Sequence, residues 1–143
     1  MAYEITREDV WVGAIEDRAG ALAEKLEAVS RIGVNLEFLI ARRAPDKPGT
    51  GVVFMAPLRG EESVRAALQA GLSQWTSAVS LRVEGPDRPG LGALITWTVA
   101  SEGISMRGTS GAKLGERAVF YLAFDSAADA DKASEALADA LNR

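Results

Sequence analysis

The feature that constrains this chain most is an internal repeat with a spacing of 70 residues. Residues 17–20 (Asp-Arg-Ala-Gly) match residues 87–90 (Asp-Arg-Pro-Gly), and each segment follows a short apolar run. The spacing still holds further along, where 33–36 (Gly-Val-Asn-Leu) matches 103–106 (Gly-Ile-Ser-Met). A fixed period of this kind is the mark of a duplicated structural unit. The sequence therefore predicts two modules built on one plan.

We place the boundary between the copies after residue 71, which gives modules over 1–71 and 72–143. In the first copy, apolar residues at helical spacing follow the turn and stop at Gly33, a residue suited to a helix end. From Val34 the period changes to two, which is typical of a strand with one buried face. The elements expected in the first copy are strands at 3–6, 10–15, 34–40 and 52–56, and helices after Gly20 and over 61–72.

The second copy repeats this order. Its expected elements are strands at 79–83, 104–109 and 117–124, and helices after Gly90 and over 127–141. Strand-helix-strand-strand-helix is most of a ferredoxin-like βαββαβ unit, so we expect an α+β fold with antiparallel sheets and helices on one face. Each copy carries its extra strand at the front, and a sheet without its last strand would expose an edge. We hypothesise that residues 2–6 close the sheet of the second copy and residues 72–77 that of the first.

Composition removes several classes of function. Neither His nor Cys occurs among the 143 residues, so imidazole and thiolate catalysis and structural zinc sites are excluded. A net charge of −4 is unsuited to a nucleic-acid surface. No apolar run is long enough to cross a bilayer. We expect a cytoplasmic protein that is not an enzyme, with no cofactor and with no nucleic-acid or membrane partner.

The Asp-Arg-Pro-Gly-Leu turn at 87–91, followed by Gly103-Ile104 at the start of the next strand, resembles the ACT domain. The resemblance covers nearly the whole chain, although the first copy has Ala19 where the second has Pro89. It implies two regulatory modules that bind an amino acid at a seam between modules. It also implies a homodimer and a partner enzyme that the protein regulates.

The predicted ligand sites lie at the two turns. A helix N-terminus offers unpaired N–H groups to a carboxylate, and glycine lets a ligand approach the backbone. The acidic residues of the turns would bind the ligand's ammonium group, or would instead cap the helices or stabilise the turns. Asn35 and Ser105 are included because the resemblance implies ligand contacts there, and their difference predicts unequal sites. The candidate residues are Asp17, Arg18, Gly20, Asn35, Asp87, Arg88, Gly90, Leu91 and Ser105.

Two other functions stay open at this point. One is an interaction subunit that regulates a separate enzyme or transcription regulator without binding a ligand. For this reading, Trp97 matters because it lies off the apolar stripe of its helix and would mark a contact surface if exposed. The other is a small enzyme that uses carboxylates or Tyr121, which requires a deep pocket holding groups with shifted pKa values.

Overall fold

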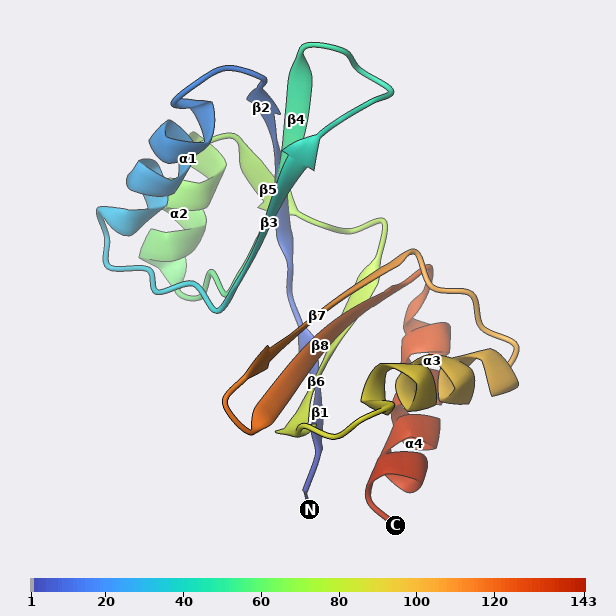
Figure 1. Ribbon diagram of the computed structural model, residues 1–143. Helices are drawn as coiled ribbons and strands as arrows, with labels where there is room; N and C mark the ends of the chain where they lie inside the picture. The colour runs from blue at the N-terminus through green and yellow to red at the C-terminus, as the bar shows by residue number, and fades with distance from the viewer. Residues whose placement is uncertain (1) are drawn as a thin grey trace. The chain divides into compact units, whose positions relative to one another are not determined.

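The computed structural model describes residues 2–143 (Figure 1). The chain divides into two compact units. The first module is Asp9–Trp75, and the second module is Thr76–Arg143 together with the N-terminal segment that ends at Glu8. The units differ from a division of the sequence at residue 71 because the second module takes one strand from the front of the chain.

The first module is a four-stranded antiparallel sheet in the order β3-β4-β2-β5. Its two helices lie on the same face of this sheet (Figure 1). The elements in chain order are β2 (Trp11–Glu16), α1 (Ala21–Ser30), β3 (Phe38–Arg43), β4 (Thr50–Ala56), α2 (Glu61–Gln69) and β5 (Leu72–Gln74).

The second module repeats this plan with the sheet order β1-β6-β8-β7. Helices α3 and α4 lie together on one face of the sheet (Figure 1). The elements are β1 (Glu4–Glu8), β6 (Val79–Pro86), α3 (Leu91–Ser101), β7 (Gly108–Leu114), β8 (Arg117–Phe124) and α4 (Ala127–Leu141). The predicted fold of two ferredoxin-like modules is confirmed.

The predicted strand exchange is also confirmed. Strand β1 forms the edge of the second sheet and pairs with β6, so that Ile5 faces Val83. Strand β5 forms the corresponding edge of the first sheet and pairs with β2, so that Leu72 faces Gly13. Both first strands of the modules are therefore paired on either side, which removes an exposed edge there.

Several predicted boundaries are wrong. Strand β3 begins at Phe38 rather than Val34, because its partner β4 ends at Ala56, opposite Phe38. Strand β7 likewise begins at Gly108 rather than Ile104. The alternating residues before these strands are therefore connections that do not pair with a neighbouring strand.

The predicted end of the second helix, at residue 72, is also wrong. Helix α2 ends at Gln69 and Gly71 adopts φ +82°, so Leu72 belongs to β5 and is buried there. Leu68 of α2, which stands at helical spacing from Val64, is 58% exposed. At the N-terminus, strand β1 continues to Glu8, past the break expected at residues 7–9.

Each module has its own hydrophobic core between the sheet and the helices. In the first module the core is small and includes Val29, Val53, Met55, Ala67 and Leu72. The second core is larger and includes Leu81, Ile95, Leu122, Phe124 and Leu137, together with Tyr3 from the front of the chain. Tyr3 belongs to the same core as Leu91, the first residue of α3, and the core of the first module has no tyrosine at its helix start.

Candidate functional site

The two predicted turns lead into helices that begin at glycine. Gly20 precedes α1 with φ +89°, and Gly90 precedes α3 with φ +82°. Both backbones are in the left-handed region, which non-glycine residues adopt at a cost. No side chain caps either helix, so the first-turn amides receive no acceptor from a capping residue. The same uncapped geometry is therefore present in both modules.

The acidic residues of the turns pair with cations in the same module. Asp17 Oδ2 accepts from Arg43 Nε at 2.9 Å, and Asp87 Oδ2 lies 3.3 Å from Lys113 Nζ. Neither aspartate acts as the side-chain cap of its helix. Each carboxylate instead joins the turn to the hairpin beside it. A ligand ammonium would have to compete with these ion pairs.

Asn35 and Ser105 lie in the extended connections after α1 and α3, and both are exposed. Neither lines the hollows found beside the first turn. Their assignment as ligand contacts stays a prediction, and it gains nothing from the geometry around the helix starts.

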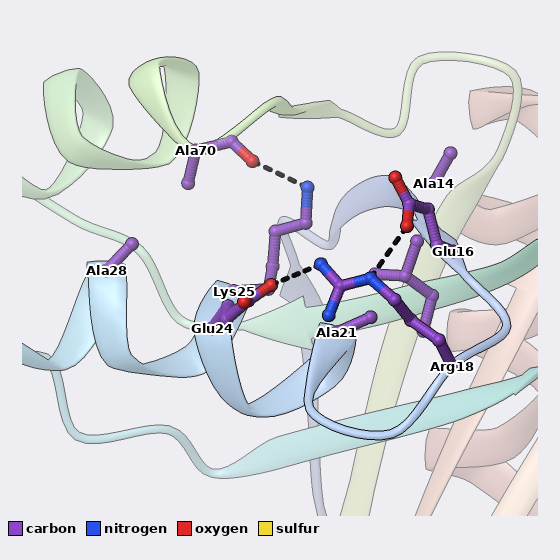
Figure 2. A pocket seen from close by; sticks show the side chains of 9 residues that line it. Ala14, Glu16, Arg18, Ala21, Glu24, Lys25, Ala28 and Ala70 are labelled. Carbon is purple, nitrogen blue, oxygen red and sulfur yellow. Dashed lines mark hydrogen bonds and ion pairs between the residues drawn. The ribbon is translucent and has the colours of Figure 1, made fainter.

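A hollow of about 300 Å³ lies in the first module beside the start of α1 (Figure 2). We call it the β2–α1 hollow. Strand β5 pairs with β2 only as far as Gly13, so the last part of β2 has no neighbouring strand on this side. Small side chains form much of the wall and leave the space open. The lining residues are Ala14, Ile15, Glu16, Arg18, Ala21, Glu24, Lys25, Ala28 and Ala70.

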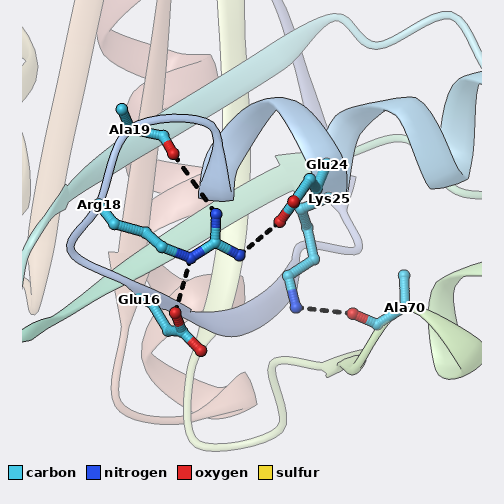
Figure 3. Close-up of polar contacts among 6 residues, drawn as sticks. All are labelled: Glu16, Arg18, Ala19, Glu24, Lys25 and Ala70. Atoms are coloured by element: carbon cyan, nitrogen blue, oxygen red, sulfur yellow. Dashed lines mark hydrogen bonds and ion pairs between the residues drawn. The ribbon is translucent and has the colours of Figure 1, made fainter.

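Arg18 crosses the rim of this hollow (Figure 3). Its Nε donates to Glu16 Oε2 at 2.7 Å and its Nη2 donates to Glu24 Oε2 at 2.6 Å. The hydrogen bond with Glu24, followed by that with Glu16, raises the pKa of Arg18 above its ordinary value. The guanidinium therefore stays charged and supplies no general acid or base near neutral pH.

Lys25 reaches across the same space from α1. Its Nζ donates to the carbonyl oxygen of Ala70 at 2.6 Å, at the end of α2 (Figure 3). No ion pair joins Lys25 to a carboxylate within residues 2–143. The hollow thus contains a partly buried ammonium group that a ligand carboxylate can bind. Sequence reasoning missed Lys25 because helical spacing alone does not show that it points toward α2.

A second, smaller hollow of about 190 Å³ lies on the other side of the Arg18 turn. It is bordered by Asp17, Arg43, Leu22 and Gly51, among others. The ion pair between Asp17 and Arg43 lies along it. Arg18 borders both hollows and Asp17 borders the smaller one, and their role as ligand contacts stays a prediction.

In the second module Tyr3 lies against Gly85, at the register position that Ala70 takes in the first module. A Cβ atom added to Gly85 would overlap the Tyr3 ring, so the ring lies directly on the strand at this glycine. Tyr3 Oη donates to the carbonyl oxygen of Pro86 at 2.6 Å. The guanidinium of Arg88 lies 5.8 Å from the ring centre, within cation–π range. Only 6% of the Tyr3 surface is exposed.

Asn142 holds Tyr3 in this place. The Tyr3 N–H donates to Asn142 Oδ1 at 2.9 Å, and Asn142 Nδ2 donates to the Tyr3 carbonyl oxygen at 3.1 Å. In the first module the same junction between second helix and closing strand is covalent, through Ala70 and Gly71. The predicted helix start at Gly90 and Leu91 therefore packs with Tyr3 in the second core. The helix start that follows Gly20 borders the β2–α1 hollow through Ala21.

Known structures share this architecture, although the sequence matches no protein-family model and no curated protein. A protein from Bacteroides thetaiotaomicron matches with a TM-score of 0.77 and 15% identity, over 94% of this chain and 89% of that one. The ligand-free regulatory subunit of aspartate kinase from Thermus thermophilus matches with a TM-score of 0.69 and 18% identity, over 98% and 97%. The regulatory subunit of aspartate kinase from Thermus flavus gives 0.63 and 16%, over 99% and 97%.

These neighbours establish the fold of the chain, which is that of two ferredoxin-like modules in tandem, and this is the fold that the sequence resemblance implied. No helix within residues 2–143 is long and apolar enough to cross a membrane. Within the same residues, no group of three or more acidic side chains could hold a metal ion.

Proposed function

We propose that this chain is a non-catalytic regulatory protein that binds a free amino acid. The observation that carries the proposal is the β2–α1 hollow, which lies beside an uncapped helix start and contains Lys25. A carboxylate can accept from the helix amides or from Lys25, while an ammonium group can bind Glu16 or Glu24 in competition with Arg18. The fold supports a regulatory role, because two full-length structural neighbours are regulatory subunits of aspartate kinase.

The protein acts, on this proposal, as a cytoplasmic homodimer that changes the activity of a partner enzyme. Binding of an amino acid stabilises the liganded form of the module and so shifts the population of its conformations. The partner enzyme then binds the liganded and ligand-free conformations of the module with different affinities. Light scattering of the purified chain tests the dimer, and a monomer would contradict that part of the proposal.

A thermal melting screen of the full chain against the common amino acids tests the binding. Ligand at about one hundred times its dissociation constant stabilises a fold by ~2.7 kcal/mol, which raises the melting temperature of a small module by several degrees. Arg18→Gln should reduce the shift, because Arg18 borders the hollow, and Arg31→Gln at the exposed end of α1 serves as the control, since Arg31 borders neither hollow. If no amino acid raises the melting temperature, the proposal is wrong.

The second candidate function is a ligand-independent interaction subunit. It is favoured by exposed apolar side chains, because Trp97 is 73% exposed on α3 and Leu114 is 87% exposed at the end of β7. Exposure of Trp97 was the outcome expected for a contact surface. Under this alternative, Trp97→Ser weakens binding to the partner while the melting screen shows no ligand.

No observation favours an enzyme. Tyr121 Oη accepts from Arg82 Nε at 3.1 Å in the second module, and neither residue borders the two hollows of the first. The shifted pKa of Arg18 belongs to a permanently charged group. We therefore include the absence of catalysis in the proposal.

A further inference from the structure

Helix α3 of the second module has no charged residue, unlike its counterpart in the first module. Helix α1 contains Glu24, Lys25 and Glu27, whereas every side chain of α3 is apolar or carries a hydroxyl group. A helix that is apolar all round is normally buried on every side. In α3 the buried residues all lie on one side, where they pack into the core of the module, and they are Leu91, Ile95 and Val99.

The opposite side of α3 is exposed. It consists of Ala93, Trp97 and Ala100, which we call the outer face of α3, and Trp97 is 73% exposed. The hydroxyl groups of the helix do not make this surface polar, because all of them bond to main-chain carbonyl groups of α3 itself. These bonds run from Thr96 Oγ1 to Gly92 at 2.9 Å, from Thr98 Oγ1 to Leu94 at 2.7 Å and from Ser101 Oγ to Trp97 at 2.8 Å.

The internal repeat shows that this apolar surface is specific to the second module. At the spacing of 70 residues, Trp97 corresponds to Glu27 and Ser101 corresponds to Arg31. Glu27 and Arg31 form an ion pair of 2.7 Å across one turn of α1, and both side chains are largely exposed. An ion pair of this kind suits a helix surface that remains in water. An indole ring at the same place suits a surface that contacts another protein.

The outer face of α3 matches a second copy of itself in shape. A two-fold contact requires that one patch be complementary to the same patch on the partner. In an antiparallel pair of α3 helices, the large Trp97 of one copy can pack over the small Ala93 of the other. Such a pair has its two-fold axis at the level of Ile95, which lies halfway between Ala93 and Trp97 along the chain.

The charges at the two ends of α3 match in the same register. Ile95 also lies halfway between Arg88, in the turn before the helix, and Glu102, directly after its last residue. Arg88 lies over the ring of Tyr3, and in the part of the chain that the structure describes neither Arg88 nor Glu102 has an ion pair. An antiparallel pair brings these unlike charges together at both ends, and it also places the helix dipoles favourably. A parallel pair would bring like charges together.

We propose that α3 is the contact surface between two copies of this chain, and that the two α3 helices pack antiparallel about a two-fold axis at the level of Ile95. Each Trp97 packs over Ala93 of the other copy, and each Arg88 pairs with Glu102 of the other copy. The apolar centre and the charged ends then form the core and the rim of the interface. This inference rests on the homodimer of the proposed function and names the surface that forms it.

Sedimentation velocity of the full chain over a range of concentrations tests the surface. Trp97→Glu should weaken dimerisation by about thirtyfold or more, because a central tryptophan contributes strongly to binding and both copies lose it. This variant introduces the residue that α1 has at the same position, so the helix should still fold, and circular dichroism checks this. The control is Leu114→Glu, which changes an 87% exposed leucine at the end of β7 and should leave the dimer unchanged.

A charge reversal tests the antiparallel register. Arg88→Glu alone should weaken the dimer by about threefold to tenfold, because it places like charges together at both ends of the contact. The double variant Arg88→Glu with Glu102→Arg should restore the affinity of the wild type. Restoration supports an antiparallel contact between copies, because the two residues form no ion pair with each other within one chain. A double variant that is weaker than Arg88→Glu alone would overturn the register.

The outcomes separate the inference from the proposed function. If the wild type is a dimer and Trp97→Glu remains as tight a dimer, the surface is wrong and the homodimer stands. Loss of the dimer in Leu114→Glu but not in Trp97→Glu would place the contact at the edge of the sheet and also overturn the inference. If the wild type is a monomer at every concentration, both the homodimer and this surface are wrong. Amino-acid binding is tested separately by the melting screen.

Discussion

The two modules begin their first helices in the same way and differ in what lies beneath. In the first module the closing strand follows α2 directly through Gly71, and Leu72 covers Gly13. In the second, the closing strand comes from 139 positions away, and Tyr3 covers Gly85, two positions nearer the turn. The comparison teaches that duplication preserves the turn and the helix start, while the chain segment that closes the sheet decides how the space beside them is packed.

The largest expected effect is on the filled side of this comparison. Tyr3→Ala should destabilise the second module by about 3–5 kcal/mol, because it removes a buried aromatic ring from the core. Tyr3→Phe should cost only about 0.5–1.5 kcal/mol, the loss of the bond to Pro86. Urea unfolding measures both.

Unfolding of the Tyr3→Ala variant in the presence of phenol gives a second test. Tyr3→Ala should leave a cavity that a phenol molecule fits. Phenol should therefore raise the urea midpoint of the variant and leave that of the wild type unchanged. A loss below about 1 kcal/mol for Tyr3→Ala would mean that the ring is not an integral part of the second core.

The next effect concerns the junction that replaces Gly71. Asn142→Ala removes both hydrogen bonds to the Tyr3 backbone and should cost about 1–3 kcal/mol. Amide exchange in β1 should accelerate more than exchange in β8, because β1 depends on this anchor. The exposed Asn35→Ala is the control, and equal exchange in both strands would contradict the anchoring role.

A smaller effect should be the same in both modules. Gly20→Ala and Gly90→Ala each place a side chain at positive φ, which costs about 1–2 kcal/mol. An added Cβ meets nothing within 4 Å at Gly90 and only Arg18 Nη1 at 3.9 Å at Gly20, so strain in the backbone is the shared cause. Chemical denaturation of the two variants should therefore give similar losses. A difference above about 1 kcal/mol would show that the turns are less equivalent than their dihedral angles indicate.

The smallest effect is a dependence on pH that Glu84 gives to the second module. The hydrogen bond from Arg82, followed by that from Arg117, lowers the pKa of Glu84 from its ordinary 4.5. A lowered folded-state pKa stabilises the fold above the unfolded value, and this contribution is lost as the pH falls through the folded value. The wild type should therefore lose more stability than Glu84→Gln between about pH 5 and pH 3. The first module has Ala14 at this position, and equal acid sensitivity of both proteins would contradict the assignment.

The repeat made most of the architecture predictable. Spacing alone placed the turns, the helices after Gly20 and Gly90, and the exchange of the closing strands. It failed near Val34 and Ile104, because an alternating pattern shows which side chains are buried but not where the neighbouring strand ends. The partly buried Val34 does pack against the first core, but without a ladder partner.

The candidate site was only half predictable for a related reason. The repeat spacing aligned Tyr3 with Ser73, whereas strand pairing gives Tyr3 the register of Ala70. The shift arises because the chain from β5 to β6 is three residues longer than the chain from β1 to β2: Leu72 precedes Val83 by 11 positions, and Ile5 precedes Gly13 by 8. Without this register, the sequence does not show that the Tyr3 ring lies against Gly85 or that Lys25 bonds the Ala70 carbonyl. Long-range pairing decides which side chain enters the space.

The paired hydrogen bonds between Asn142 and Tyr3 also make the chain suitable for circular permutation. A short glycine linker between these residues, with new ends opened between Trp75 and Thr76, would let each module be encoded by one continuous segment. The polypeptide would then pass between the modules once, where it now passes twice. Such a rearranged protein would allow the module with the β2–α1 hollow and the module with Tyr3 in its core to be separated and studied as independent folding units.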